Sequence, residues 1–389
     1  MTSGATEANA APVIGIVAGE ASGDLLGAHL INALRSRRPD LRFDGIAGPR
    51  MVAAGATALY PMEKLAVRGY VEVLRHYREI AGIRRKLAQH FLAQKPAMFI
   101  GIDAPDFNLD LEIQLRESGI KIIHYVSPSI WAWRGGRIAK IKRAADHMLC
   151  IFPFETAIYD KAGMAAAYVG HPLADLLADY PSRESVREKL GIGAGATVIA
   201  LLPGSRVGEL QAMAELFVAT ASCIAATQPK IEFLAPLVNK ETRTIFESAL
   251  AKHPSLRVRV LDGQSHDAIA AANTVLVASG TATLETALLQ RPMVITYKMP
   301  RVSWWLMRGR RYQPWVGLPN ILAEEFVVPE ILQDDATPER LAREMLELLG
   351  DDARRARIES RFAQMRGELR CDSARRAADA ILPLLPARA

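Results

Sequence analysis

The chain has 389 residues, of which 50% are hydrophobic and 23% charged, and its formal net charge at pH 7 is +6. This composition excludes a disordered tail or a fibrous protein, and the length predicts two globular domains with sizeable cores. The mild basic excess is typical of proteins that bind anionic ligands or an anionic membrane surface, and it lies far from the charge of strongly basic nucleic-acid-binding proteins.

Neither a membrane span nor secretion is expected. No segment has eighteen uninterrupted apolar residues, and the first eleven residues lack both a basic start and a long apolar run. The three cysteines, Cys150, Cys223 and Cys371, form no CxxC pair. We expect them to be buried free thiols in a reducing cytoplasm, and we predict no metal site and no cofactor.

Short β-rich runs alternate with longer helical patterns along the chain. The predicted strands are 13–18, 43–47, 98–102, 121–126 and 148–151, then 197–202, 231–235, 257–261, 274–278 and 293–296. This alternation predicts an α/β fold with two doubly wound, Rossmann-like domains. We expect domains over 1–172 and 173–336. The helical segment 337–389 is expected either to pack on the second domain or to dock on another domain or subunit.

The first predicted strand runs into Gly19-Glu20-Ala21-Ser22-Gly23-Asp24. The glycines would bring the following helix close to a ligand, and Ser22 is expected to cap that helix. The stretch does not match G-x-G-x-x-G, so a dinucleotide-binding function is disfavoured.

A carboxylate follows the predicted strand 98–102, in Gly101-Ile102-Asp103-Ala104-Pro105-Asp106-Phe107-Asn108. At the carboxyl end of a strand, Asp103 is suited to act as a general base for a hydroxyl nucleophile. Alternatively, Asp103 or Asp106 caps a turn or a helix. After the next strand, the aromatic residues and arginine of segment 124–134 would line a sugar or acyl pocket or form part of the core, and spacing favours neither.

Two turns of the second half are suited to a phosphorylated ligand. Leu202-Pro203-Gly204-Ser205-Arg206 follows a buried strand and supplies backbone N–H groups, a hydroxyl and a guanidinium at the start of a helix. Ser279-Gly280-Thr281-Ala282-Thr283-Leu284-Glu285 follows another, and its glutamate is placed to accept hydrogen bonds from sugar hydroxyls. Such turns gather at one edge of a parallel sheet, so the pair predicts a nucleotide diphosphate site.

Two stretches combine apolar and basic side chains. Segment 64–91 is a basic amphipathic pattern of the kind that lies on anionic lipid. Segment 301–315 interleaves Trp with Arg, which suits lipid headgroups and also single-stranded nucleic acid. Buried core helices remain the alternative for both.

Taken together, these motifs resemble those of the bacterial lipid-A-disaccharide synthase family. The blocks that carry the resemblance are 19–24, 101–108, 124–134, 152–155, 170–172, 202–206, 279–285 and 317–320. They occur in the expected order over about residues 14–333, whereas the first ten residues match nothing in the family pattern.

The resemblance implies a GT-B glycosyltransferase whose N-terminal domain binds the acceptor and whose C-terminal domain binds the nucleotide sugar. The implied reaction is an inverting transfer that joins UDP-2,3-diacylglucosamine to 2,3-diacylglucosamine 1-phosphate. It gives a β-1,6-linked disaccharide 1-phosphate and UDP, in lipid A biosynthesis, without a metal. The family also implies a peripheral enzyme on the cytoplasmic face of the inner membrane, a homodimer that exchanges C-terminal elements, and no nucleic-acid partner.

Residue roles follow from the same resemblance. Asp103 would be the base, and Arg206 would stabilise the leaving diphosphate. The nucleotide-sugar residues would be Gly204, Ser205, Arg206, Ser279, Gly280, Thr281, Glu285 and Asn320. The acceptor residues would be Glu20, Ser22, Gly23, Asp24, Asp106, Ser127 and Trp131, and the acyl or membrane contacts would be Val67, Val71, Leu74, Arg84, Arg85 and Lys86.

Other functions remain open from the residues alone. A different GT-B enzyme, such as a UDP-N-acetylglucosamine transferase or epimerase, would keep the two nucleotide turns without needing the basic apolar stretch. An RNA- or lipid-binding protein would explain the Trp and Arg segment without needing Asp103. A nicotinamide-dependent oxidoreductase is the weakest alternative, because the first turn lacks the glycine pattern.

Overall fold

A computed structural model describes residues 11–65, 70–131, 135–299 and 314–386, without the side chains of 70–77 and 135. The chain divides into two compact units. The first comprises residues 1–175 and 369–389, and the second comprises 176–368. The C-terminal segment is therefore divided between the units, and its last helix belongs to the first one.

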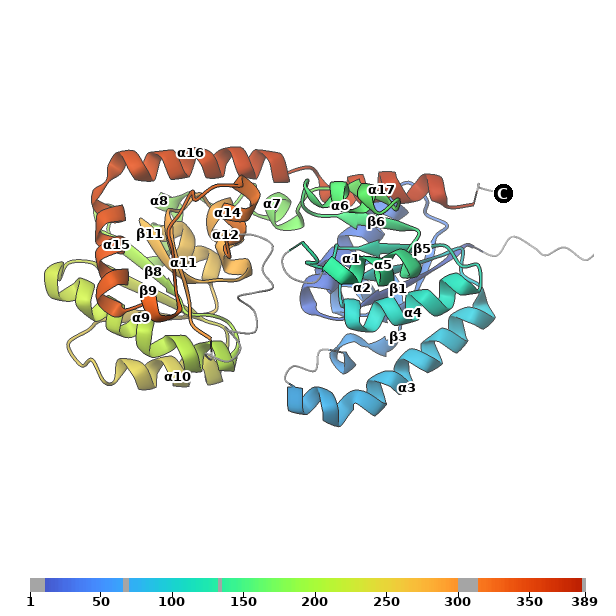
Figure 1. Cartoon of the computed structure of the whole chain (residues 1–389), viewed down its shortest axis with the longest axis horizontal. Helices are drawn as coiled ribbons and strands as arrows, with labels where there is room; N and C mark the ends of the chain where they lie inside the picture. Colours follow the sequence, from blue (N-terminus) through green and yellow to red (C-terminus); the bar gives the residue numbers. More distant parts are fainter. Residues whose placement is uncertain (1–10, 66–69, 132–134, 300–313, 387–389) are drawn as a thin grey trace, which may run out of the picture. The chain divides into compact units, whose positions relative to one another are not determined.

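The first unit contains a parallel sheet with the strand order β3-β2-β1-β4-β5-β6-β7 (Figure 1). Its strands are β1 (Val13–Ala18), β2 (Arg42–Ala47), β3 (Ala56–Pro61), β4 (Met98–Ile102), β5 (Ile122–Tyr125), β6 (His147–Cys150) and β7 (Ala165–Tyr168). Its helices are α1 (Ala21–Arg35), α2 (Pro49–Ala53), α3 (Tyr70–Gln94), α4 (Pro105–Glu117), α5 (Ile138–Ala144), α6 (Glu155–Lys161) and α17 (Ser373–Ile381). Short 3-10 turns are η1 (Met62–Lys64), η2 (Gly135–Arg137) and η4 (Leu382–Leu384).

The second unit repeats this plan with the strand order β10-β9-β8-β11-β12-β13, also parallel. Its strands are β8 (Val198–Leu202), β9 (Glu232–Leu237), β10 (Val258–Asp262), β11 (Thr274–Ala278), β12 (Met293–Tyr297) and β13 (Glu330–Leu332). Its helices are α8 (Arg183–Leu190), α9 (Val207–Thr227), α10 (Lys240–Leu250), α11 (Ser265–Ala271), α12 (Thr281–Leu288), α14 (Leu318–Ala323), α15 (Pro338–Gly350) and α16 (Asp352–Leu369), with the 3-10 turn η3 (Gln333–Asp335). Helix α7 (Pro172–Leu176) spans the division between the units.

Each predicted strand is present within a few residues of its expected bounds, so the two parallel α/β sheets are confirmed. In both sheets the strand order reverses at the centre, between β1 and β4 in the first and between β8 and β11 in the second. Ligands of open parallel sheets bind beyond the carboxyl ends of the strands at such a reversal. Ligand sites are therefore expected at the turns after these four strands.

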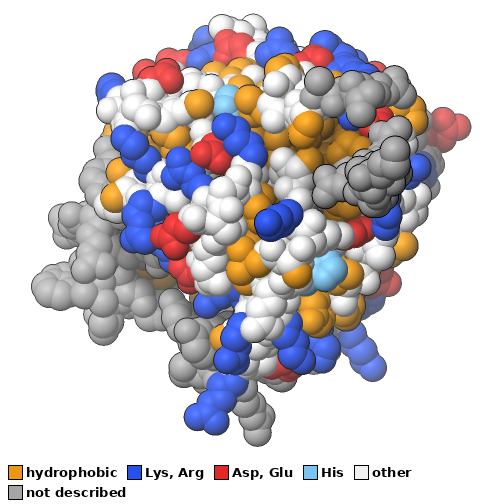
Figure 2. All heavy atoms as spheres, turned by 90° about the vertical axis from the view of Figure 1, so that its right-hand side faces the viewer, with side chains coloured by type: hydrophobic (Ala, Val, Ile, Leu, Met, Phe, Trp, Pro, Cys, Tyr) orange, Lys and Arg blue, Asp and Glu red, His pale blue; other side chains and the backbone are white. Residues whose placement is uncertain are grey.

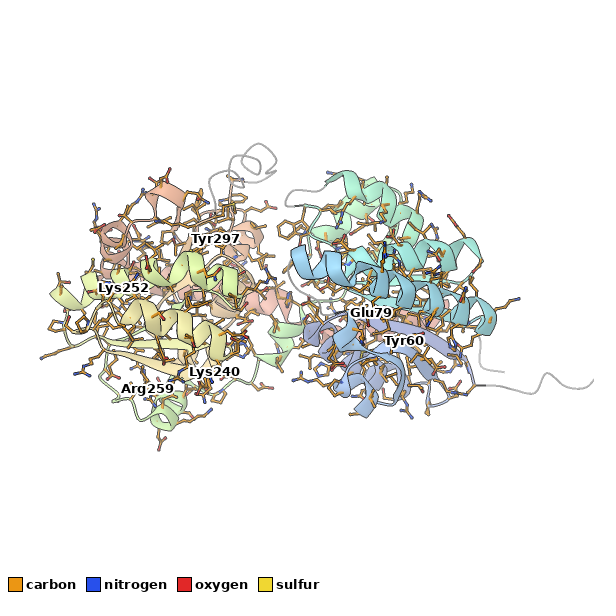
Figure 3. All side chains as sticks on the ribbon, turned by 90° about the horizontal axis from the view of Figure 1, so that it is seen from below. Tyr60, Glu79, Lys240, Lys252, Arg259 and Tyr297 are labelled. Carbon is orange, nitrogen blue, oxygen red and sulfur yellow. The ribbon has the colours of Figure 1, made fainter. Side chains whose placement is uncertain are left out.

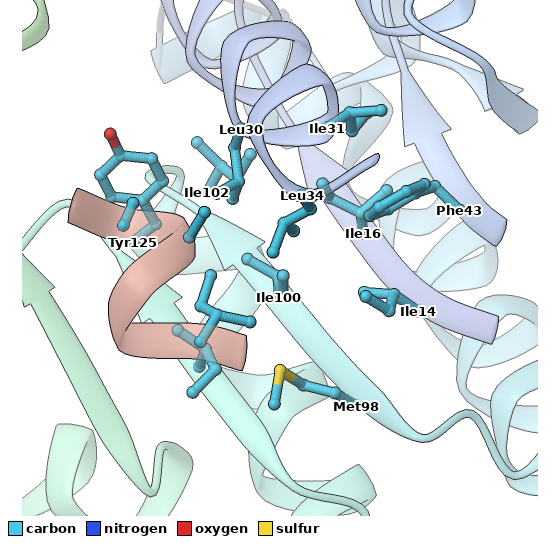
Figure 4. Packing of buried hydrophobic residues seen from close by; sticks show 14 of the residues in the cluster. Ile14, Ile16, Leu30, Ile31, Leu34, Phe43, Met98, Ile100, Ile102 and Tyr125 are labelled. Atoms are coloured by element: carbon cyan, nitrogen blue, oxygen red, sulfur yellow. The ribbon is translucent and has the colours of Figure 1, made fainter. Parts of the chain in front are cut away.

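Apolar side chains cover both faces of the first sheet and form two clusters. One lies between the sheet and helices α1 and α17 (Figure 4), and the other lies under α3, α4 and α5. Helix α17 contributes Ala377, Ala378 and Ile381 to the same cluster as Ile14 and Leu30. Helix α17, near the C-terminus, therefore packs in the same core as strand β1, near the N-terminus.

Among the described residues, α9 is the one helix whose length and apolar composition would allow it to cross a membrane. Half of that helix is buried inside the protein, and it packs against α10 and α15. A core helix passes the same test of length and composition, and α9 fits that description.

Asp175 fixes the start of α17 within the first unit. Its Oδ1 accepts the backbone N–H groups of Cys371 at 3.1 Å and Asp372 at 2.9 Å, and its Oδ2 accepts that of Ser373 at 2.6 Å. The first N–H groups of a helix have no partner inside it, and a carboxylate there also opposes the positive end of the helix dipole. Asp175 therefore caps α17 from a distant part of the sequence.

We expect Asp175→Ala to lower the free energy of unfolding of the first unit by about 2–3 kcal/mol, because a charge-assisted cap is lost. Urea unfolding followed by circular dichroism measures the change. Asp160→Ala removes an exposed carboxylate of the same unit and should change stability by less than about 0.5 kcal/mol. An unchanged urea midpoint for Asp175→Ala would show that apolar contacts alone hold α17.

Candidate active site

Two turns of the second unit meet in one cavity of about 440 Å³. One turn follows β8 and the other follows β11, the two strands at the reversal of the sheet. All but one of the residues predicted to bind the nucleotide sugar line this cavity: Gly204, Ser205, Arg206, Ser279, Gly280, Thr281 and Glu285. The structure thus brings together two turns that lie about 75 residues apart in the sequence.

Hydrogen-bond donors converge on this cavity from two helix N-termini. Helix α9 begins at Val207, directly after Arg206, and helix α12 begins at Thr281. The unpaired N–H groups and the dipole of a helix N-terminus both favour an anion. Tyr297, the last residue of β12, also lines the cavity (Figure 3). These donors are suited to a diphosphate.

Glu209 engages the backbone donors of the first turn. Its Oε2 accepts the N–H groups of Ser205 at 3.0 Å and Arg206 at 3.2 Å, and Arg206 Nη1 lies 3.4 Å from its Oε1. Gly204 has φ +126°, a backbone conformation that favours glycine. A Cβ at this position would also lie only 2.8 Å from the Cβ of Glu209, so there is no room for a larger residue. The sequence analysis missed Glu209, although its place three residues into the helix is typical of a capping box.

Glu285 and Asn320 have different surroundings. Glu285 Oε2 lies 3.4 Å from His266 Nε2 at the cavity. The Asn320 amide is fully buried, and its Nδ2 donates to the Val328 carbonyl and to Glu330 Oε1, both at 2.9 Å. Its Oδ1 accepts the Val328 N–H at 3.0 Å. Asn320 therefore holds the loop between α14 and β13 and does not line the cavity.

In the first unit, the turn after β4 has an unusual backbone. Asp103 and Ala104 are consecutive non-glycine residues in the left-handed region, with φ +49° and +44°. This conformation is disfavoured for residues with a Cβ, and it occurs most often where a site requires it. A Cβ on Gly19 would lie 2.8 Å from the Cβ of Ala104, so the turn after β1 packs directly on the turn after β4.

The Asp103 carboxyl lies in a partly buried, charged environment. Burial raises its pKa, the charge of His124 and a backbone hydrogen bond at Ala104 lower it, and the charge of Glu20 raises it, with a net rise. A carboxylate with a raised pKa is a better general base than an exposed one. Asp103 thus lies at the sheet reversal with a raised pKa.

Behind Asp103 lies a buried pair that the sequence analysis did not include. His124 Nδ1 is 2.7 Å from Glu112 Oε1, and both side chains are fully buried. A signal for it was present, because Asn108 and Glu112 are polar residues four positions apart on the face of α4 that also buries Leu111 and Leu115.

Three residues of the turn after β1 lie in different environments. Helix α1 begins at Ala21 with Glu20 at the N-cap, so the prediction that Ser22 is the cap is wrong, and the Ser22 side chain is exposed. Gly23 is buried, and a Cβ added to it would lie 3.3 Å from the Cβ of Ala18. Glu20 is exposed and has electrostatic partners. Glu20 and Ser22 therefore remain accessible to a ligand.

Asp24 is buried and serves the fold. Its Oδ1 accepts the Met51 N–H at 2.9 Å and its Oδ2 accepts the Arg50 N–H at 3.0 Å. These are among the first N–H groups of α2, so Asp24 caps that helix. Because both oxygens are engaged, a direct contact with an acceptor substrate is disfavoured.

The remaining predicted acceptor residues also differ in how much of their surface is exposed. Asp106 is exposed and forms an ion pair with Arg137. Ser127 is buried, with its Oγ 2.7 Å from the Tyr159 hydroxyl. Trp131 is half-buried, and its Nε1 donates to Glu155 Oε1 at 3.1 Å. Asp106 and Trp131 have surface that a substrate can reach, whereas Ser127 has little.

Trp131 belongs to an aromatic cluster built over Glu155. Its ring lies edge-on to Phe152 and Phe154, at centroid distances of 6.2 and 5.3 Å. Glu155 Oε2 accepts the N–H groups of Ile151 at 3.1 Å and Phe152 at 3.0 Å. Burial raises the pKa of Glu155 to about 7, despite these hydrogen bonds.

This raised pKa predicts a pH dependence of stability. The folded pKa of Glu155 lies above its unfolded value, so the folded state binds the extra proton and stability falls as pH rises from about 4.5 through 7. The loss is on the order of 3 kcal/mol. Thermal unfolding of Glu155→Gln should show a shallower fall between pH 5 and 8 than the parent. Equal slopes would show that Glu155 titrates normally.

Helix α3 combines core and surface residues. Its Ile83, Leu87 and Phe91 side chains are buried under the first sheet, so this half of the predicted amphipathic stretch is a core helix. Arg85 and Lys86 are exposed. Arg84 is half-buried, where its Nη1 donates to Asp110 Oδ2 at 3.1 Å. Val67 and the side chains of Val71 and Leu74 lie outside the described residues.

The second membrane candidate, segment 301–315, also lies almost entirely outside the described residues, apart from Pro314 and Trp315. The Trp315 ring lies edge-on to Phe326, at a centroid distance of 6.1 Å, and Phe326 is one of the most exposed large apolar side chains of the described residues. Trp315 and Phe326 therefore supply apolar surface at the C-terminal end of the predicted segment.

Metal-ligating groups do not cluster among the described residues: no three His, Cys, Asp or Glu side chains converge there. All three cysteines are free, as expected. Cys150 is buried, whereas Cys223 and Cys371 are only half-buried. The expectation of buried thiols therefore holds for one of the three.

Sequence comparisons match nearly the whole chain. The family model described as lipid-A-disaccharide synthetase matches residues 14–381. A lipid-A-disaccharide synthase of Methylobacillus flagellatus is 54% identical over 376 residues, which cover 96% of this chain and 100% of that protein. One from Azoarcus sp. is 52% identical over 381 residues, with 97% of each chain covered.

Solved structures with the same fold are more distant in sequence. A UDP-GlcNAc 2-epimerase from Neisseria meningitidis, bound to UDP-GlcNAc, has a TM-score of 0.65 at 11% identity and covers 95% of this chain and 99% of its own. The glycosyltransferase of kitacinnamycin has a TM-score of 0.62 at 16% identity, with 96% and 99% covered. These similarities confirm the GT-B fold.

Proposed function

The chain belongs to the lipid-A-disaccharide synthase family of glycosyltransferases, and from this membership we propose its reaction. It joins UDP-2,3-diacylglucosamine to 2,3-diacylglucosamine 1-phosphate and releases UDP and a β-1,6-linked disaccharide 1-phosphate. The observation that carries the proposal is the cavity of the second unit, where two helix N-termini, a guanidinium and a carboxylate meet at the reversal of the sheet. That set of groups suits a sugar linked to a nucleotide diphosphate.

The chemistry proposed is a direct displacement with inversion at the anomeric carbon. Asp103 takes the proton from the 6-hydroxyl of the acceptor as that oxygen attacks. The bond to UDP breaks on the opposite face, and Arg206 with the N-terminus of α12 stabilises the charge that develops on the diphosphate. In this proposal the first unit holds the acceptor and the second holds the nucleotide sugar, and cationic side chains with backbone N–H groups take the role of a metal.

An assay with both purified lipid substrates tests this function. Mass spectrometry should detect the disaccharide 1-phosphate in amounts equal to the UDP released. Unacylated UDP-glucosamine with the same acceptor serves as the control and should give far less product, because the acyl chains supply binding surface. UDP-sugar epimerisation, or UDP release without a disaccharide, would contradict the proposal and point to another enzyme of this fold.

We also propose that the protein works as a peripheral enzyme on the cytoplasmic face of the inner membrane, because its substrates are acylated. The exposed Arg85 and Lys86 of α3 are the described basic residues that support this surface. Elsewhere, on the face drawn in Figure 2, basic side chains are mixed with apolar and acidic ones. A homodimer that exchanges C-terminal elements remains part of the same proposal.

We expect the protein to sediment with anionic liposomes and to be released at high salt, because surface charge is then screened. Replacing Arg85 and Lys86 with Glu should weaken this binding, since each basic group near the lipid contributes about 1 kcal/mol. Arg84 is retained because its replacement would break the Asp110 contact. Lys121 and Lys161, replaced with Glu, give the same charge change on the same unit and should bind as the parent does. Equal binding of both double variants would exclude α3 as the lipid contact.

A further inference from the structure

Gly101 leaves a space beneath Asp103 that a carboxylate fills. Strand β4 pairs with β5 so that Gly101 lies beside His124. A Cβ at position 101 would overlap Glu112 Oε1, so the carboxyl group of α4 occupies the place that a side chain of β4 would take. Glycine at this position therefore allows Glu112 to reach His124 inside the sheet–helix layer.

The pair that results is fully buried. Burial lowers the pKa of His124. The charge of Glu112, the hydrogen bond to Glu112 and the charge of Asp103 raise this pKa by more, so the net shift is upward. Fully buried ion pairs contribute little to stability, because desolvation costs about as much as the attraction returns. A role beyond stability is therefore worth seeking for this pair.

Three buried polar atoms of His124 and the facing side of α4 have no hydrogen-bond partner among the described residues: His124 Nε2, Glu112 Oε2 and Asn108 Oδ1. Buried polar groups are nearly always paired, so these atoms are exceptions that require an explanation. The Asp103 backbone is held at the same place, because its N–H donates to the Tyr125 carbonyl at 2.8 Å and Asn108 Nδ2 donates to its carbonyl at 2.8 Å.

We propose that His124, held protonated by Glu112, is a positioning residue whose charge keeps the nearby Asp103 carboxylate ionised. This inference rests on the proposed function, in which Asp103 is the base. The proton of the acceptor hydroxyl passes to Asp103, and His124 keeps its own proton throughout. Asp103, after β4, is the charged group that acts on the pair from outside it, and Glu20 at the start of α1 acts in turn on Asp103.

The pH profile of kcat/KM distinguishes this role from a purely structural one. His124→Gln removes the positive charge, so the acidic limb should move up by about one to two pH units. Below the parental limb, kcat/KM should therefore fall about 10- to 100-fold and recover at higher pH, with the KM for the UDP-sugar unchanged. Glu112→Gln should move the limb in the same direction by a smaller amount. An acidic limb at the parental pH in both variants would overturn the proposal.

A second measurement keeps the test valid if these buried variants fold poorly. In protein labelled at its eight histidines, NMR should show His124 protonated from pH 6 to 8. In Asp103→Asn, which leaves the pair itself intact, the His124 pKa should fall because a neighbouring negative charge is lost. A neutral His124 at pH 7 in the parent would overturn the proposal.

The two proposals fail in different ways. Full activity of Asp103→Asn would remove Asp103 as the base, and the role of His124 in this reaction would fall with it. An inactive Asp103→Asn together with an unmoved pH limb in His124→Gln would leave the base in place and reject only the positioning role.

Discussion

Replacing Asp103 with asparagine should lower turnover by about 100-fold or more and leave UDP affinity nearly unchanged. The amide keeps the size and shape of the carboxyl but cannot accept the proton of the acceptor hydroxyl. Asparagine also tolerates the left-handed backbone of position 103 better than most residues, so the turn should persist. Steady-state kinetics with both lipids and UDP binding by calorimetry measure the two quantities.

Asp106→Asn is the matched control for this experiment. Asp106 lies three residues further on, is exposed, and pairs with Arg137. If it contacts the acceptor, its replacement should raise the acceptor KM while turnover stays within a few-fold of the parent. Near-normal turnover of Asp103→Asn would remove Asp103 from the mechanism, and Glu20 would be the next carboxylate to test.

Arg206→Ala should cost roughly 2–4 kcal/mol of transition-state stabilisation, which is a loss of about 30- to 1,000-fold in kcat/KM. The guanidinium is largely exposed and lines the cavity, where Glu209 is its ion-pair partner. Arg206→Lys should recover only part of the loss, because an ammonium lacks the planar pair of donors. Kinetics at saturating acceptor measure the effect.

Arg243→Ala provides the comparison for Arg206→Ala. Arg243 is a surface arginine of the same unit that pairs with Glu247 and Asp262, so its removal should leave kcat/KM unchanged. Full activity of Arg206→Ala would place the diphosphate elsewhere. Addition of EDTA should change turnover little, and complete loss of activity on chelation would contradict the metal-free chemistry proposed for this cavity.

Most of the fold could be predicted because buried strands of a parallel sheet are continuous apolar runs. Strands β1, β4 and β11 have the predicted bounds, and the other central strands differ by a few residues. Strands β3, β7 and β13 were missed, and all three lie at sheet edges. Edge strands are partly exposed and need fewer β-branched residues, as the sequence Ala-Ala-Ala-Tyr of β7 illustrates.

The site could be predicted where a ligand-facing turn directly follows a buried strand. This rule found the cavity residues of both turns in the second unit. The roles of Asp24 and Asn320 came from the family resemblance, and in the structure their polar atoms bond to the backbone of other elements. The rule also missed Glu112: its place on the buried face of α4 is visible in the sequence, but its contact with His124 depends on which way α4 leans over β5.

The place of α17 sets an order of events during synthesis. The core of the first unit needs Ala377, Ala378 and Ile381 beside Ile14 and Leu30, yet the ribosome makes the whole second unit in between. At about 5–20 residues per second, roughly 190 residues delay the last helix by about 10–40 s. During that interval the side of α1 that faces α17 has no cover. A nascent chain stalled before residue 370 should therefore recruit a chaperone to α1, and release of the last twenty residues should free it.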